Sequence, residues 1–455
     1  MQPLPAKAPD PRQQMPSLPQ AGHRLTWTSA LIVLAAGYAH ALSMAWPFAA
    51  IGPLATGQAW GGLQLASLSV LVWQLAPALA SRCAAQAAWL AWLFASAMLA
   101  GTFWWLFISM HFYGGLPAPL TVLAVLALAA ALALYYALAA AVYALLAPGS
   151  ALGRALVFAA LWLLAELARV RIFTGFPWGE GGYAHIDGWA RPLAGWVGVH
   201  GLTLLAALCA ALVPILFAGW RPHSAGVTRQ ALACAALLAA GWGVSSLPAA
   251  ILAVAPGSVQ RPPLTVTLVQ GNVAQDQKFQ PGTGVQDALD YYGAQLQSAT
   301  TALVVLPETA FPLLPDQLPP AYWAALKQRF ASGSQAALIG LPMGSQRDGY
   351  SNAVLGLQPG APDYRYDKQH LVPFGEFVPP FFSWFIRLMN IPLGDFKRGA
   401  LVAEVQGADG LTFHARWVSR FGLAPWWLLG GGVLLLAALA RWRSARRLES
   451  TPGQG

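Results

Sequence analysis

The sequence predicts a polytopic α-helical membrane bundle that carries an α/β domain outside the membrane. Apolar residues make up 57% of the chain and charged residues only 9%, and most of the chain's first half is almost free of charge. Between residues 30 and 250 the charged residues are Arg82, Arg154, Glu166, Arg169, Arg171, Glu180, Asp187, Arg191, Arg221 and Arg229. So few charges cannot coat a soluble globule, whereas helices satisfy their own backbone hydrogen bonds in lipid.

Eight apolar segments supply the roughly 20 apolar residues that a membrane-spanning helix needs. Seven of them precede the polar region and the eighth follows it. They lie at about 27–46, 60–80, 84–110, 117–146, 151–170, 193–220, 230–254 and 423–440. The chain is therefore expected to form a bundle of seven helices at 27–254, a water-facing domain at 255–422 and an eighth helix at 423–440.

Basic residues predict the orientation of the bundle, because they accumulate on the cytoplasmic side of a membrane. Most of the basic residues lie in alternate loops and at the two ends of the chain. They account for the net charge of +9, so this charge does not require a nucleic-acid partner. We expect a disordered cytoplasmic tail at 1–26, a basic cytoplasmic tail at 441–455 and the domain at 255–422 on the opposite side. The outer connection at 171–192 keeps Arg171 and Arg191 against this bias, which makes it a candidate functional loop.

Cofactor chemistry has no signal in the sequence. Cys83, Cys209 and Cys234 show no CxxC spacing, so we interpret them as small buried apolar side chains. The histidines lack the spacing of metal ligands, and there is neither a phosphate-binding glycine loop nor a basic and aromatic stripe. We expect no metal, no other cofactor and no nucleic-acid partner.

The polar region has the pattern of an α/β layered domain. Residues 264–269 alternate and are β-branched, and 301–306 and 336–340 are apolar runs typical of buried strands. Helices are expected at 285–296 and 322–330, each between two of these strands. A strand, helix, strand, helix, strand order is typical of an α/β fold.

Three polar side chains of this domain are candidates for catalysis. Glu308 directly follows a predicted buried strand, whereas Lys368 and Glu376 lie in a loop rich in proline and glycine. Each could be an ordinary surface charge when it is considered alone. Together, an acid and a lysine are parts that acyl transfer requires, with a nucleophile as the third.

Three segments of the domain, LPETAFP at 306–312, DKQHLVPFGEFVP at 367–379 and VQGNV at 269–273, resemble the nitrilase-like domain of apolipoprotein N-acyltransferases. In the membrane half, Trp162, Glu166, Arg169 and the GFPW run at 175–178 are similar to a motif of the same family. The GLTFHAR ending of the domain, before the last helix and the basic tail, is also similar. The resemblance implies a carbon–nitrogen hydrolase fold on the periplasmic side of a bacterial inner membrane.

The resemblance also implies a reaction and roles for individual residues. The family moves an acyl chain from a phospholipid to the N-terminal lipidated cysteine of a diacylglyceryl-modified apolipoprotein, through a thioester and without a cofactor. Glu308 would be the general base, Lys368 would stabilise the oxyanion and Glu376 would support this site. Glu166, Arg169, Trp178 and Phe279 would contact substrates, and Phe279 replaces the tryptophan that is usual there.

The sequence departs from the family at the nucleophile. A cysteine should follow the stretch at 396–399 by a few tens of residues, but the chain has no cysteine after Cys234. The stretch runs near 400–404 almost directly into Glu404, which resembles the family's last strand. We therefore expect a truncated nitrilase-like domain with an exposed apolar face, and no acyl transfer. Ser351 could in principle replace the thiol, but nothing in the surrounding sequence supports it.

Alternative interpretations stay open at this point. Glu166 and Arg169, three residues apart on one helical face, could form a structural ion pair instead of a functional site. The chain could also be a non-catalytic relative that binds lipid or lipoprotein. A transporter is a third class, which the long polar domain and the lack of paired half-chain repeats do not favour.

Overall fold

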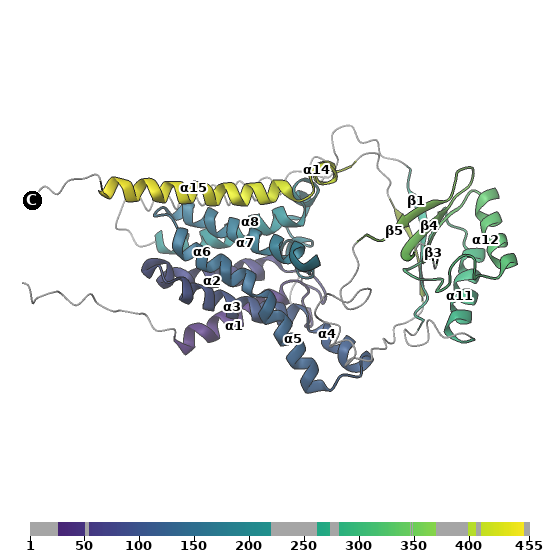
Figure 1. Ribbon diagram of the computed structural model, residues 1–455, viewed down its shortest axis with the longest axis horizontal. Helices are drawn as coiled ribbons and strands as arrows, with labels where there is room; N and C mark the ends of the chain where they lie inside the picture. Colours follow the sequence, from purple (N-terminus) through teal and green to yellow (C-terminus); the bar gives the residue numbers. More distant parts are fainter. Residues whose placement is uncertain are drawn as a thin grey trace, which may run out of the picture.

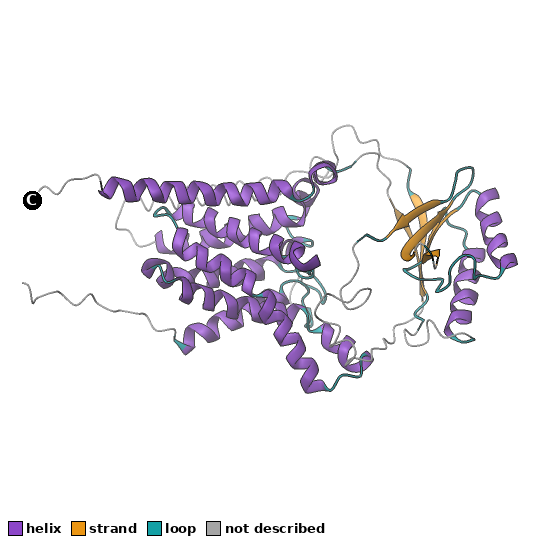
Figure 2. Cartoon of the chain, in the orientation of Figure 1, coloured by secondary structure: helices purple, strands orange, loops and turns teal. Residues whose placement is uncertain are grey.

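The computed structural model of this protein describes residues 26–50, 54–219, 262–273, 282–345, 347, 349–369, 399–405 and 411–449. A helix bundle and a separate sheet with two helices make up this part of the chain (Figures 1 and 2). The sheet lies beyond the end of the bundle at which α14 (Phe413–Phe421) meets α15 (Ala424–Glu449). Both predicted components of the fold, apolar helices and an α/β unit, are therefore present.

Six described helices are long and apolar enough to cross a membrane: Gly61–Ser81, Ala84–Thr102, Ala118–Leu146, Ala151–Arg171, Arg191–Pro214 and Ala424–Ser444. A shorter apolar helix, α1 (Trp27–Leu42), packs beside them. These seven elements match seven of the eight predicted spans. The predicted span at 230–254 lies outside the described residues.

Two of the predicted spans are interrupted. The segment expected at 84–110 ends its regular helix, α3 (Ala84–Thr102), before Phe103 and continues as α4 (Trp105–Ile108) and a π-helical turn, η2 (Ser109–Tyr113). The segment expected at 117–146 consists of α5 (Ala118–Leu132) and α6 (Leu134–Leu146), which meet at Ala133. Uniformly apolar sequence gives no signal for such breaks, because every position suits lipid or core equally well.

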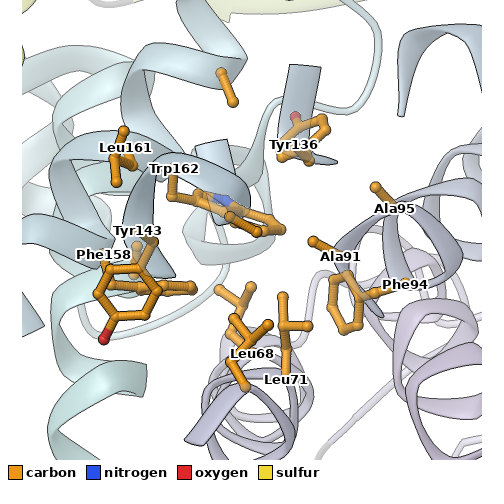
Figure 3. Packing of buried hydrophobic residues seen from close by; sticks show 14 of the residues in the cluster. Leu68, Leu71, Ala91, Phe94, Ala95, Tyr136, Tyr143, Phe158, Leu161 and Trp162 are labelled. Carbon is orange, nitrogen blue, oxygen red and sulfur yellow. The ribbon is translucent and has the colours of Figure 1, made fainter. Parts of the chain in front are cut away.

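The core of the bundle is built by α2 (Gly61–Ser81), α3, α6, α7 (Ala151–Arg171) and α8 (Ala194–Gly219). Trp162 of α7 lies in the middle of this core, where its ring contacts those of Phe94, Tyr136 and Phe158 at centroid distances of 5.9, 4.7 and 5.8 Å (Figure 3). Small residues such as Ala91 and Ala140 line the same cluster and let the helices approach closely.

The prediction that all three cysteines are buried is wrong for Cys83. Cys209 is buried in α8, but Cys83 is exposed, because it lies in the turn between α2 and α3, at the residue before α3 begins. Cys234 lies outside the described residues.

The sheet contains six strands in the order β5-β4-β3-β2-β1-β6. These are β1 (Leu264–Gln270), β2 (Leu303–Val305), β3 (Ala336–Ser345), β4 (Gly349–Leu357), β5 (Tyr364–Asp367) and β6 (Gly399–Val405). The first three run parallel to one another, and β4 and β6 run antiparallel to their neighbours. The three strands expected from the sequence correspond to β1, β2 and β3. The pairing of β6 with β1 agrees with the strand-like sequence around Glu404.

Two helices, α11 (Gly284–Ser298) and α12 (Pro320–Ser332), cover one face of the sheet (Figure 2). Val269 points into this core, so Leu264 and Leu268, which differ from it by odd steps along β1, point to the other face. Both are exposed, as is Val405, the partner of Leu264 in β6. On the side of the sheet opposite the helices these three apolar side chains are exposed, whereas Val266, on the same face of β1, is buried.

Candidate active site

Glu308 is held at the sheet edge by the buried residues on either side of it. The amide of Leu306 donates to the carbonyl of Leu338, and the amide of Phe311 donates to the carbonyl of Gly340, at 2.8 and 3.1 Å. Between these two anchors the backbone of Pro307 crosses over Gly340. A Cβ atom on Gly340 would lie 2.2 Å from the carbonyl oxygen of Pro307, so this crossing requires glycine.

Lys368 reaches Glu308 from the far side of two intervening strands, β3 and β4. β5 runs in the same direction as β2, because it is antiparallel to β4, which is antiparallel to β3. Lys368 after β5 and Glu308 after β2 therefore emerge at the same edge. The Lys368 amide donates to the carbonyl of Asn352 at 2.8 Å, and its Nζ lies 3.1 Å from Glu308 Oε1.

Asn352 completes this cluster, which we call the Glu308 site (Glu308, Asn352 and Lys368). Its side-chain amide donates to Glu308 Oε1, and its position opposite Pro342 in the β3–β4 ladder aims it toward the loop after β2. Asn352 was not predicted from the sequence. The apolar run at 353–355, followed by Leu357, is a strand signal that could have placed Asn352 in or next to a buried strand.

The Glu308 site faces solvent rather than a closed cavity. The Glu308 side chain is 58% exposed and that of Lys368 is 27% exposed, so their ion pair contributes little to stability. A carboxylate here can accept a proton, and the adjacent ammonium can stabilise a negative oxygen. The other two site residues that the sequence analysis singled out in this domain, Phe279 and Glu376, lie outside the described residues.

Ser351 is not arranged as a nucleophile for this site. Its hydroxyl donates to Asp367 Oδ1, and Asp367 also binds the guanidinium of Arg365 at 2.8 Å. The hydrogen bond from Arg365, together with that from Ser351, holds the pKa of Asp367 below its usual value. A carboxylate that stays charged and shared with an arginine is a poor base for the serine hydroxyl.

Glu166 belongs to a second polar cluster, which is buried in the bundle. Its Oε2 accepts from the amide of Gly181 at 2.7 Å, and its Oε1 accepts from the Thr203 hydroxyl at 2.7 Å and lies 3.3 Å from His200 Nδ1. The side chain is 1% exposed. A carboxylate in such a place needs these donors, because burial of an unpartnered charge is very costly.

Arg169 has a separate set of partners. Its Nη1 donates to the carbonyls of Phe176 and Trp178 at 2.5 and 2.8 Å, and its Nε donates to the Tyr136 hydroxyl at 3.3 Å. Within the part of the chain that the structure describes, Glu166 and Arg169 form no ion pair. The alternative of a structural ion pair is therefore wrong: each residue binds a different part of the loop that follows α7.

This loop folds back into the bundle and is the candidate functional loop of the sequence analysis. It contains Gly175 at a φ of +85°, where a Cβ atom would lie 1.8 Å from the carbonyl oxygen of Val170. The Trp178 ring is partly exposed and lies 5.8 Å from that of Trp105 and 4.8 Å from that of Phe176. Trp178 therefore belongs to an aromatic group at the end of the bundle that faces the sheet.

The loop also carries two titratable side chains that the sequence analysis did not select. Burial, with a contribution from the charge of Glu166, raises the pKa of Glu180 to about 7. Burial lowers the pKa of His185 to about 4, and its Nε2 lies 2.9 Å from Gln64 Oε1. Glu180 Oε1 also lies 4.0 Å from His200 Nε2, so this group continues the cluster around Glu166.

Comparison with known proteins identifies the family. A family model described as the apolipoprotein N-acyltransferase N-terminal domain matches residues 53–212. An apolipoprotein N-acyltransferase from Verminephrobacter eiseniae is 52% identical over 399 residues, which span 84% of this chain and 70% of the relative. The chain belongs to the apolipoprotein N-acyltransferase family.

Further relatives carry the same name. The enzyme from Ralstonia nicotianae is 42% identical over 349 residues, which cover 74% of this chain and 62% of the relative. That from Bordetella bronchiseptica is 40% identical over 422 residues, which cover 84% and 72%. This is an acyltransferase family, and the matched part leaves 28–38% of each of these three relatives without a counterpart.

Proposed function

We propose that this protein holds the substrates of apolipoprotein N-acylation but does not form the thioester that carries the acyl chain. The donor would be a membrane phospholipid and the acceptor a diacylglyceryl-modified apolipoprotein. The observation that supports this proposal is the Glu308 site: Lys368 Nζ lies 3.1 Å from Glu308 Oε1, while the sequence has no cysteine after Cys234.

The residues that are present would perform only part of the reaction. Glu308 would accept the proton of an attacking group, and Lys368 would stabilise the oxyanion of the tetrahedral intermediate. Neither side chain can hold the acyl chain between the departure of the donor and the arrival of the acceptor, which is the task of the thiol. At most, the site would promote slow hydrolysis of an ester by water.

The membrane half supports a lipid donor. Glu166 and Arg169 together hold the loop after α7 through hydrogen bonds with Gly181, Phe176 and Trp178. They also bind Thr203 of α8 and Tyr136 of α6. This places the aromatic group around Trp178 at the end of the bundle, where tryptophan is favoured at a membrane surface. We propose that this end faces the periplasm of a bacterial inner membrane and that the aromatic group contacts the donor lipid.

A second candidate function is that of a binding protein without any turnover. The family model matches the membrane half from residue 53 to residue 212, and the polar cluster around Glu166 is fully formed. A relative that keeps this half and lacks the nucleophile could bind phospholipid or lipoprotein in a regulatory role.

The test is complementation of a bacterial strain depleted of its own N-acyltransferase, with mass spectrometry of a lipoprotein N-terminus. We expect no N-acylation by this chain, whereas the V. eiseniae relative should restore it. Full N-acylation that depends on this chain would contradict the proposal. Co-purification of the lipidated apolipoprotein without its acylation would favour the binding function.

Orientation can be tested separately with reporter fusions at Gln14 and Gly349. The two fusions should report opposite sides of the membrane, with Gln14 in the cytoplasm. Fusions that report the same side would contradict the proposed periplasmic position of the sheet.

A further inference from the structure

The short helix α14 lies across the direction of the last membrane span. Figure 1 shows α15 along its length and α14 nearly end-on beside it. Gly422, at a φ of +57°, ends α14, and its amide donates to the carbonyl of Val418 at 2.8 Å. Because only two residues separate α14 from α15, a helix α15 that crosses the membrane places α14 at the membrane surface, parallel to it.

One face of α14 is packed against the start of α8. The His414 ring lies over Gly198, where a Cβ atom would be 2.1 Å from its Nε2. Trp417 Nε1 donates to the carbonyl of Trp196 at 3.5 Å, and the Phe413 and Trp196 rings lie 5.5 Å apart. These contacts fix the rotation of α14 about its axis and therefore determine which side chains remain outside.

The outer face of α14 combines arginine with aromatic side chains. Arg416, Arg420 and Phe421 are exposed, and Phe413 also keeps more than half of its surface free. Arg416 Nε donates to the carbonyl of Leu411 at 3.0 Å, which holds its guanidinium at the surface. Neither arginine forms an ion pair with a carboxylate among the described residues.

The same end of the bundle has an excess of positive charge. Arg171 at the end of α7 and Arg191 at the start of the Arg191–Pro214 span are exposed as well, and α15 and α14 pack on α7 and α8 respectively. In the described residues of this end, Asp187 is the single exposed carboxylate. Basic residues on the side opposite the basic termini run against the usual distribution, and guanidinium groups pair well with phosphate.

We propose that α14 is an interfacial helix whose Arg416 and Arg420 bind the phosphate groups of anionic phospholipids at the membrane surface. Phe421 enters the boundary between headgroups and acyl chains, as the apolar residues of surface-bound helices do. The lipid anchors the segment that connects the sheet to α15. This proposal does not depend on whether the Glu308 site catalyses any reaction.

Hydrogen–deuterium exchange of peptides that cover 411–423 tests it in the full-length protein. The protein is placed in nanodiscs of phosphatidylcholine alone or with phosphatidylglycerol. We expect the anionic lipid to slow exchange in α14 of the wild type, and each of Arg416→Gln and Arg420→Gln to remove about fivefold of this slowing. Arg347→Gln, which removes an exposed arginine from the sheet, should leave the slowing unchanged.

Three results would overturn the proposal. The first is equal exchange of α14 in both lipids, and the second is slowing that persists when both arginines are replaced by glutamine. The third is that Arg347→Gln removes as much of the slowing as Arg416→Gln or Arg420→Gln does. If the glutamine variants exchange faster in phosphatidylcholine as well, α14 itself has been loosened. The double variant Arg416→Lys and Arg420→Lys then decides, since it keeps the charge and should keep the slowing. Slowing by inorganic phosphate without anionic lipid would also contradict a lipid surface as the partner.

Discussion

The two polar clusters of this protein differ in what holds them together. The cluster around Glu166 is buried in the bundle, and the carboxylate has three polar partners within 3.3 Å. The Glu308 site stands at a sheet edge in contact with solvent, and its position depends on backbone anchors at Leu306, Phe311 and Gly340. Buried polar groups are costly unless every partner is present, whereas an exposed site can lose a component without unfolding its surroundings.

This difference bears on the proposed loss of the nucleophile, because the described parts of both clusters form without it. The membrane half keeps its polar cluster because removal of any member would destabilise the bundle. The sheet keeps β1, β2 and β3 in parallel order with two covering helices, which form a core without the missing segment. On the opposite face Leu264, Leu268 and Val405 are exposed.

The largest effect is expected from Glu166→Ala. Loss of this carboxylate leaves the Gly181 amide and the Thr203 hydroxyl buried without an acceptor, at about 2 kcal/mol each. The free energy of unfolding, measured by thermal or chemical denaturation in detergent, should fall by about 4 kcal/mol. The control is Asp187→Ala, which removes an exposed carboxylate that accepts from the Ala59 amide and should cost about 1 kcal/mol. Equal effects of the two variants would refute the proposed difference between buried and exposed clusters.

Substitution of Glu180 should change the folding stability by an amount that depends on pH. Its pKa rises from 4.5 to about 7 on folding, so the folded state binds more protons than the unfolded state in this range. Glu180 therefore contributes stability below pH 4.5 that is lost as the pH rises through 7. Glu180→Gln should gain stability relative to the wild type over this window, by about 3 kcal/mol in total.

The quantity to measure is the difference in the free energy of unfolding between Glu180→Gln and the wild type at each pH. His185, whose pKa is lowered from 6.5 to about 4, contributes in the opposite direction, since its stability is present above pH 6.5 and lost as the pH falls through 4. The two contributions oppose each other in the wild-type curve. A pH-independent difference between Glu180→Gln and wild type would show that Glu180 is not perturbed in the folded protein.

An intermediate effect is expected at Gly340. In Gly340→Ala the new Cβ atom collides with the carbonyl of Pro307, so the loop that carries Glu308 must shift, at about 2 kcal/mol. Gly431→Ala in α15 provides the control, because a Cβ atom there meets no atom within 4 Å, and it should be neutral or slightly stabilising. The measurement is hydrogen exchange in peptides covering 306–311, which should quicken only in Gly340→Ala.

The smallest effect on stability is expected from Lys368→Gln. The ion pair with Glu308 is partly solvated, since Glu308 is 58% exposed, and such pairs contribute about 1 kcal/mol or less. The same substitution should abolish acyl transfer in a variant whose missing segment, with its cysteine, has been restored, because the oxyanion then loses its cation. A large loss of stability, or full activity of the restored variant when it also carries Lys368→Gln, would contradict the role assigned to the lysine.

The sequence predicted the Glu308 site better than the cluster around Glu166. Glu308 was placed after a buried strand, but Lys368 was placed only in a loop and Asn352 was missed, because β4 and β5 were not recognised. Glu166 was selected for its unusual position in a membrane span. Its partners, Gly181 and Thr203, lie 15 and 37 residues away, and helix periodicity alone does not indicate which helices face each other.

The central claim is that this chain forms no acyl-enzyme. Mass spectrometry of the intact protein after incubation with phospholipid tests it directly, with the V. eiseniae relative as the positive control. The relative should gain the mass of one acyl chain, and hydroxylamine should remove it, as expected of a thioester. The chain described here should keep its unmodified mass under the same conditions. An acyl adduct on this chain would contradict the account, and its position would identify the nucleophile.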